Sequence, residues 1–185
     1  KRQKSHSYYL LKGLVKLETT NPSGDFTYLD YVKEKSFFPY SESLNQASYG
    51  YTGYARTDVD LMIFSSQLMT DIMQANPDQM IYMFKQLSNI TVYLEKRIQM
   101  NSISSASDRV IMTLAIWLYD MGLDFKGEMA IPHPLTINEL AQVAGTTRET
   151  AGKVVKQLTK QDLISFTRQG IYYKDQDYFY NLIRN

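Results

Sequence analysis

The sequence predicts an α+β protein in which an antiparallel β-roll is followed by a long helix and a second, mainly helical domain. Three observations predict this order. Aromatic and β-branched residues alternate in strand-like runs within the first sixty residues. An uninterrupted helical pattern covers residues 77–101, and two short helical patterns separated by a glycine turn lie beyond residue 135. A chain of 185 residues is long enough for one large domain or two small ones.

The composition excludes several classes of function. The 20 Lys and Arg residues nearly balance the 19 Asp and Glu residues, so any affinity for nucleic acid must come from a local patch. The absence of cysteine excludes disulfides, thiolate metal sites and a catalytic thiol. Two histidines are too few for a histidine-built metal site. We therefore expect no metal and no other cofactor.

The sequence also carries no sign of a membrane segment or of an enzyme. It has no run of 18 apolar residues, and the basic start Lys1–Lys4 is followed by Ser5-His6-Ser7 rather than by the apolar part of a signal peptide. There is no Gly-rich phosphate loop, no nucleophile elbow and no clustered acid–base set. We expect a cytoplasmic protein that is not an enzyme and does not bind a membrane.

Residues 1–76 are predicted to form the β-roll. Strands are expected over Tyr8–Leu17 and Phe26–Val32, and one or two more between Gly50 and Ile63. A short helix is expected to start at Ser65 or Ser66. One group of aromatic residues either lines a pocket for a small apolar or aromatic effector or belongs to the core and surface of the roll. The group is Phe37, Phe38, Tyr40, Tyr49, Tyr51 and Tyr54.

Residues 77–101 are predicted to form one helix that pairs with a second copy of the chain. Pro77 suits the first helical position because its missing N–H has no partner there in any case. Apolar residues then recur at alternating spacings of four and three, as in a heptad seam. The seam consists of Met80, Phe84, Leu87, Thr91, Leu94 and Ile98. A seam this narrow favours a homodimer, and the alternative is a helix that packs on its own β-roll.

Residues 102–185 are predicted to form a winged helix-turn-helix domain. A serine-rich link at 101–107 connects it to the long helix. Thr136 and Glu139 form a capping box at the start of the first helix. Gly145 supplies the left-handed residue of a tight turn, and Thr147 caps a second helix that runs to about Lys160. A strand is expected at 128–131, and a hairpin over 163–174 forms the wing.

The outer face of the second helix has the chemistry that reads base pairs. Arg bonds guanine in bidentate fashion, Glu accepts from cytosine, and Lys reaches bases or phosphate. Arg148, Glu149 and Lys153 lie in the first two turns, where a recognition helix meets base edges, and Lys156 also faces outward. Thr136 and Thr147 can offer hydroxyl groups to phosphates. The alternative is an ordinary solvated helix face.

The segment from Leu135 to Leu158 resembles the DNA-binding segment of the Crp/Fnr transcription regulators, most specifically in Thr147-Arg148-Glu149-Thr150-Ala151-Gly152-Lys153 followed by Leu163-Ile164-Ser165. Weaker resemblance covers the β-roll and the long helix. The resemblance implies a homodimer that reads a palindrome in double-stranded DNA, with RNA polymerase as a candidate partner. It implies Arg148 and Glu149 as base readers, Lys153 at a position where many members have Arg, and Thr136, Asn138 and Thr147 as phosphate or base-edge contacts.

The chain departs from this family at two places. Members that bind cyclic nucleotides carry a Gly-Glu pair and an Arg-Ser pair, whereas Ser36–Ser48 keeps Glu42 without a preceding glycine and contains no arginine. A buried cyclic phosphate needs a cation or a nest of N–H groups, so cAMP is not expected to bind. The family's first strands would begin before Lys1, so the β-roll is expected to be incomplete at its N-terminus.

Three hypotheses follow from the sequence. The first is a homodimeric, sequence-specific DNA-binding regulator. The second is a sensor whose β-roll takes a small metabolite other than cAMP and thereby switches DNA binding. The third is a dimeric interaction module that no longer binds DNA.

Overall fold

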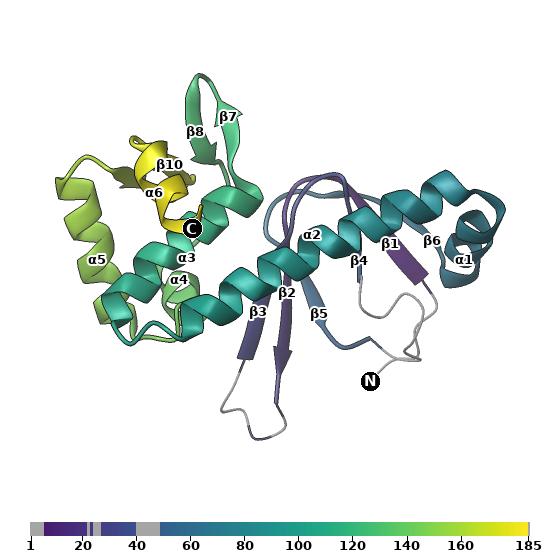
Figure 1. Ribbon diagram of the computed structural model, residues 1–185, viewed down its shortest axis with the longest axis horizontal. Coiled ribbons are helices and arrows are strands. Elements are labelled where there is room, and N and C mark those ends of the chain that lie inside the picture. The colour runs from purple at the N-terminus through teal and green to yellow at the C-terminus, as the bar shows by residue number, and fades with distance from the viewer. Residues whose placement is uncertain (1–5, 22, 24–26, 40–48, 185) are drawn as a thin grey trace. The chain divides into compact units, whose positions relative to one another are not determined.

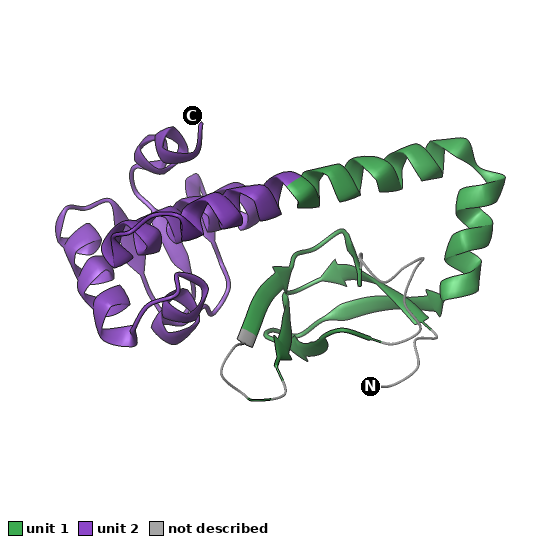
Figure 2. Ribbon diagram, turned by 60° about the horizontal axis from the view of Figure 1, so that its bottom comes forward, with its two compact units in different colours: residues 1–91 green, residues 92–185 purple. Residues whose placement is uncertain are grey.

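The computed structural model describes residues 6–21, 23, 27–39 and 49–184. The chain divides into two compact units, residues 1–91 and 92–185 (Figure 2). The boundary falls inside the long helix α2 (Pro77–Asn101), so this helix contributes residues to both units. Within the part of the chain that the structure describes, no helix has the length and apolar character needed to span a membrane.

The first unit contains two three-stranded antiparallel sheets (Figure 1), as predicted for a β-roll. One sheet has the order β4-β1-β6 and the other β3-β2-β5. The strands are β1 (His6–Lys12), β2 (Val15–Thr20), β3 (Thr27–Val32), β4 (Ser36–Phe38), β5 (Thr52–Ala55) and β6 (Asp60–Ser65). A buried cluster of Leu10, Val15, Val32 and Phe38 draws on strands of both sheets. The ring of Tyr8 stacks on that of Phe38 with centroids 5.2 Å apart.

The single strand predicted over Tyr8–Leu17 is wrong. Gly13 has φ +94°, which turns the chain so that β1 and β2 join different sheets. A Cβ at Gly13 would lie 2.4 Å from the carbonyl oxygen of Asp58, so the turn is also tightly packed. Strand β4 lies at the start of Ser36–Ser48, the stretch that corresponds to the Gly-Glu and Arg-Ser pairs of the members that bind cyclic nucleotides. The alternation of apolar residues did not predict this strand because it has only three residues. Phe26 lies outside the described residues.

The helices at the end of the first unit begin where the sequence predicts. Helix α1 covers Ser66–Ala75, and the Ser65 side chain caps it by accepting a hydrogen bond from the Leu68 N–H at 3.1 Å. Helix α2 then begins at Pro77.

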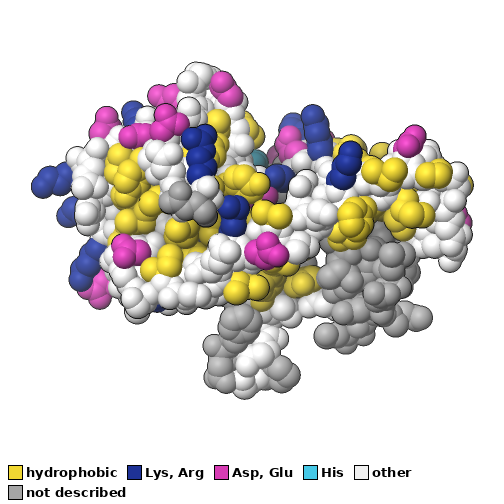
Figure 3. Space-filling model, viewed as in Figure 1, with side chains coloured by type: hydrophobic (Ala, Val, Ile, Leu, Met, Phe, Trp, Pro, Cys, Tyr) yellow, Lys and Arg dark blue, Asp and Glu magenta, His cyan; other side chains and the backbone are white. Residues whose placement is uncertain are grey.

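Helix α2 has both buried and exposed apolar residues. Met83, Tyr93 and Met100 are buried. The heptad seam is exposed at every position, with Phe84 70% and Ile98 67% accessible. The seam therefore presents an accessible apolar surface in the single chain. Figure 3 shows apolar side chains on the surface over the N-terminal part of this helix.

The second unit is assembled around α3, which packs against α4, α5, α6 and β8. Its four-stranded antiparallel sheet has the order β7-β8-β10-β9. The elements are α3 (Ala106–Met121), β7 (Leu123–Phe125), β8 (Glu128–Ile131), α4 (Ile137–Val143), α5 (Arg148–Lys160), β9 (Ile164–Phe166), β10 (Ile171–Tyr173) and α6 (Gln176–Ile183). Trp117 is 1% exposed and lies in the core of this unit. The buried Tyr173 hydroxyl donates to the Leu114 carbonyl oxygen at 2.9 Å.

Two features of this unit differ from the sequence prediction. Helix α3 starts at Ala106, inside the predicted link, because the Ser105 side chain accepts from the Asp108 N–H and so caps the helix earlier. Strand β7 was not predicted, and it pairs with β8 through the register Leu123↔Ala130 to complete the sheet.

Candidate nucleic-acid interface

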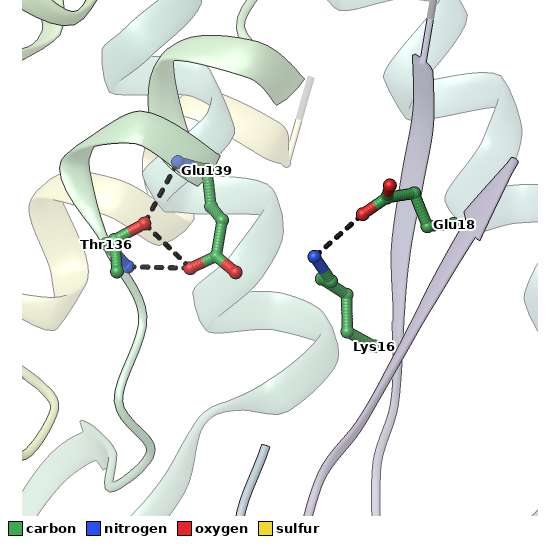
Figure 4. Close-up of polar contacts among 4 residues, drawn as sticks. All are labelled: Lys16, Glu18, Thr136 and Glu139. Carbon is green, nitrogen blue, oxygen red and sulfur yellow. Dashed lines mark hydrogen bonds and ion pairs between the residues drawn. The ribbon is translucent and has the colours of Figure 1, made fainter. Parts of the chain in front are cut away.

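The first helix of the helix-turn-helix, α4, is fixed by a complete capping box (Figure 4). The Thr136 hydroxyl accepts from the Glu139 N–H at 3.2 Å. The Glu139 carboxylate accepts from the Thr136 N–H at 2.9 Å and from the Thr136 hydroxyl at 2.8 Å. Glu139 is 7% exposed, so the box also satisfies a buried carboxylate.

This geometry changes the role that the sequence suggested for Thr136. Both of its donors, the N–H and the hydroxyl, already point at Glu139, so Thr136 has no donor left for a phosphate in this arrangement. The donors that remain at this end of α4 are the following backbone N–H groups and the exposed Asn138 amide. Asn138, the other residue predicted to contact a phosphate or a base edge at this end of α4, is exposed.

The turn and the second helix follow the predicted pattern closely. Gly145 has φ +59°, as the left-handed position requires. The Thr147 hydroxyl accepts from the Thr150 N–H at 3.2 Å and caps α5, and it lies 3.0 Å from the Thr150 hydroxyl. The inner face of α5 is buried and consists of Ala151, Val154, Val155 and Leu158.

The opposite face of α5 is charged and exposed. Arg148, Glu149, Lys153 and Lys156 are all exposed, together with Thr147 at the N-cap. Between residues 146 and 160 the sequence has four basic residues and one acidic residue. Figure 3 shows basic side chains projecting from the surface at α5. The structure thus brings the predicted base readers together on one surface.

Glu149 and Lys153 form an ion pair on this surface. Their charged atoms are 2.8 Å apart at a spacing of four residues. The hydrogen bond between them raises the pKa of Lys153 and lowers the pKa of Glu149, so both groups stay charged. Because the side chains are 75% and 78% exposed, solvent screens the pair and it contributes little to stability. Both groups can therefore exchange this bond for bonds to bases at small cost.

The wing carries one further exposed basic residue, which the sequence analysis did not single out. The Thr167 hydroxyl accepts from the Gln169 and Gly170 N–H groups, which fixes the turn between β9 and β10. Arg168 lies exposed at the tip of this turn. A basic residue in the turn of a predicted wing hairpin is the signal that would have found it.

The first unit contains a cavity of about 930 Å³ inside the β-roll. Four of the six predicted aromatic residues, Phe38, Tyr49, Tyr51 and Tyr54, line it. Phe37 does not, because its ring packs against Tyr9 at 4.6 Å and against Phe64 at 5.8 Å. Tyr40 lies outside the described residues.

The cavity wall is poor in charge. Among the described residues that line it, Glu18 is acidic and none is Lys, Arg or His. The Glu18 carboxylate is paired with the Lys16 ammonium at 2.7 Å (Figure 4). A hydrogen bond with Tyr49 and burial raise the pKa of Tyr8 to about 12, so this phenol stays neutral at physiological pH. None of the described lining residues is a cation that could bind a phosphate.

Comparison with known proteins identifies both parts of the chain. Residues 113–181 match the Crp-like helix-turn-helix domain, and residues 2–76 match the cyclic nucleotide-binding domain. The HTH-type transcriptional regulator ArcR of Staphylococcus aureus is 27% identical over 164 residues, which cover 88% of this chain and 69% of that protein.

Solved structures share the fold. FixK2 from Bradyrhizobium japonicum superimposes with a TM-score of 0.78 at 16% identity, over 98% of this chain and 88% of that one. TTHA1359, a transcriptional regulator of the CRP/FNR family from Thermus thermophilus, gives a TM-score of 0.61 at 22% identity, over 97% and 88%. The fold and the two matched domains define a transcription regulator with a DNA-binding helix-turn-helix and a cyclic nucleotide-binding-like domain. The chain belongs to the Crp/Fnr family, as the resemblance of the Leu135–Leu158 segment indicated.

Replacing the glycines of the helix-turn-helix and the wing should have unequal effects on stability. Gly145→Ala introduces a left-handed alanine into open space and should cost about 1 kcal/mol in the free energy of unfolding. Gly170→Ala should cost more, about 2–3 kcal/mol, because its Cβ would lie 2.4 Å from the carbonyl oxygen of Ile131. Urea unfolding measures both. Gly127→Ala is the control, since Gly127 also has positive φ and open surroundings. Equal losses at Gly145 and Gly170 would contradict the close approach of the wing to Ile131.

Proposed function

We propose that the protein is a cytoplasmic homodimer that binds a palindromic DNA site and regulates transcription from it. One observation carries the proposal: α5 buries one face and leaves Arg148, Glu149 and Lys153 exposed on the other, in its first two turns. These are the turns of a recognition helix that reach base edges in the major groove. Lys156 is a further DNA contact on this face, and Asn138, Thr147 and the backbone at both helix N-termini bind phosphates.

The dimer is proposed from the exposed seam of α2. All six positions at heptad spacing are accessible, and five of them carry large apolar side chains that are more than one third exposed. These five are Met80, Phe84, Leu87, Leu94 and Ile98. A matching seam on a second copy would cover this face in coiled-coil fashion. A twofold-symmetric protein reads a palindrome, and regulation of transcription then involves contact with RNA polymerase.

Selection of bound sequences from a random duplex pool tests this function. The full chain is expected to enrich a twofold-symmetric motif with half-sites about one helical turn apart. Its affinity should fall steeply with salt because bound phosphates release counterions. Light scattering on the same sample should give the mass of a dimer. A dimer with no enriched motif and no salt-dependent binding would favour the interaction module instead.

Arg148→Ala should weaken binding to the selected site roughly 5- to 150-fold, because one bidentate contact to guanine is lost. It should also relax the preference at one base-pair position. Fluorescence anisotropy on the selected duplex and on its single-base variants measures both effects. Lys160→Ala, at the far end of α5, is the charge-matched control and should change affinity little on any sequence. Equal losses on all duplexes would show that Arg148 contacts only phosphate.

Leu87→Glu combined with Leu94→Glu should convert the dimer into a monomer. Two carboxylates on the seam would face their copies across a proposed apolar interface, where an unpaired charge is costly. Sedimentation measures the mass, and DNA affinity should fall with it. The control carries Asn89→Glu and Gln99→Glu, which add the same charge on exposed positions off the seam. A dimer that survives the seam variant would place the interface elsewhere.

A second function is supported by the cavity in the β-roll. We propose that it takes a small aromatic effector that is neutral or cationic, and that this effector switches DNA binding. The cavity has about 930 Å³, aromatic walls and no cation among its described lining residues. These features favour a planar apolar ligand over a cyclic phosphate.

Probes of different charge test this second function. p-Cresol or tyramine should raise the melting temperature of the full chain and shift its DNA affinity, because a ligand that binds only the folded state stabilises it. The anionic cAMP should do neither. Stabilisation by cAMP alone would overturn the proposed effector class, and stabilisation by none of the probes would count equally against it.

A further inference from the structure

Arg109 joins three segments that meet beside the helix-turn-helix. Its side chain donates four hydrogen bonds, all to backbone carbonyl oxygens. Nε donates to Ala144 at 3.0 Å, and the terminal nitrogens donate to Gly145 at 3.1 Å, Ile103 at 2.8 Å and Ser104 at 3.0 Å. Ala144 and Gly145 belong to the turn before α5, and Ile103 and Ser104 to the link after α2.

The chemistry of these acceptors requires arginine. Ala144 is the C-cap of α4, where carbonyl groups lack partners in the helix and carry the negative end of its dipole. A cation is therefore favoured at this end. The planar guanidinium carries five N–H donors in a fixed fork and can reach acceptors on both sides at once. A lysine ammonium is a compact donor on a flexible chain and cannot span the same set.

Arg109 lies at an unfavourable position for a cation on its own helix. It lies close to the N-terminus of α3, where the helix dipole disfavours a positive charge. The surrounding carbonyl groups offset this cost. Arg109 is also linked to α2 through Thr113. The Thr113 hydroxyl donates to the Arg109 carbonyl oxygen at 2.8 Å and lies 3.0 Å from the sulfur of Met100. Met100, one residue before the end of α2, is 2% exposed.

The turn held by Arg109 leads directly into the recognition helix. Gly145 is two residues before the N-cap Thr147 and three before Arg148. The start of α5 and the end of α2 are therefore both tied to one side chain. Within residues 92–185, this clamp sets how the base-reading end of α5 is held relative to the last turn of α2.

We propose that Arg109 is a positioning residue for DNA recognition. It does not bind DNA through its side chain, whose donors face the four carbonyl groups. It fixes the start of α5 relative to α2 and thereby sets the separation of the two recognition helices in the dimer. This inference rests on the proposed function of the chain as a dimeric DNA-binding protein.

The experiment compares Arg109→Lys with Arg184→Lys in the full chain. The first variant keeps the charge and breaks the clamp. The second makes the same chemical change in the same unit, at a residue whose guanidinium lies over the Tyr180 ring, away from the clamp. Each protein is titrated against the selected palindrome, against duplexes whose half-site spacing is changed by single base pairs, and against a duplex with one half-site. Melting temperatures are measured in parallel.

The clamp predicts a specific pattern. Arg109→Lys should lose about tenfold in affinity for the palindrome at its best spacing, while affinity for one half-site changes much less. The preference for one spacing should flatten. Arg184→Lys should behave as the wild type. Equal losses on the palindrome and on the half-site, together with a lower melting temperature, would show that Arg109 only stabilises the fold. No loss on either duplex would also overturn the proposal.

These outcomes are separate from failure of the proposed function. If the wild-type chain selects no palindrome, the function fails before Arg109 is tested. If the wild type selects one and Arg109→Lys keeps its spacing preference, the function stands and the positioning role is wrong.

Discussion

Burial of α3 is the interaction on which the DNA-reading unit depends. Its apolar side chains, Trp117 and Leu114 among them, are almost completely inaccessible, and α4, α5, α6 and β8 all pack against this helix. Burying one large apolar side chain contributes about 1.5–3 kcal/mol, so this core outweighs any exposed ion pair in the unit. The recognition surface can therefore consist of charged, weakly paired side chains. Stability comes from the inner face of α5, which leaves the outer face available for DNA.

Buried and accessible apolar residues are also separate along α2, whereas in the β-roll the same side chains have two roles. On α2, Met83, Tyr93 and Met100 are buried, whereas the heptad seam stays accessible. In the β-roll, aromatic side chains provide both the packing and the wall of a cavity, as the stacked Tyr8 and Phe38 rings show. Among the described lining residues there is no cation to pair with a cyclic phosphate.

Local signals were sufficient wherever neighbouring residues decide the structure. The capping box of Thr136 and Glu139, the left-handed Gly145 and the N-cap Thr147 all occur as predicted, because each depends on residues within one helical turn. Sequence patterns did not predict the structure where residues far apart in the sequence determine it. Gly13 divides the predicted strand between two sheets, and β7 exists because it pairs with β8. The role of Arg109 as a clamp also depends on acceptors whose positions the pattern does not reveal.

The sequence by itself determined the α+β fold, the helix-turn-helix with its charged outer face, the heptad seam and the family. Periodicity, capping and turn chemistry are encoded locally, so they can be read without coordinates. Only the tertiary structure decided which aromatic side chains line the cavity, which residues of α2 are buried, and what the Arg109 guanidinium binds. Each of these depends on residues 35 or more positions apart, or on packing between elements, because a side chain selects its partners only after the backbone has brought them within reach.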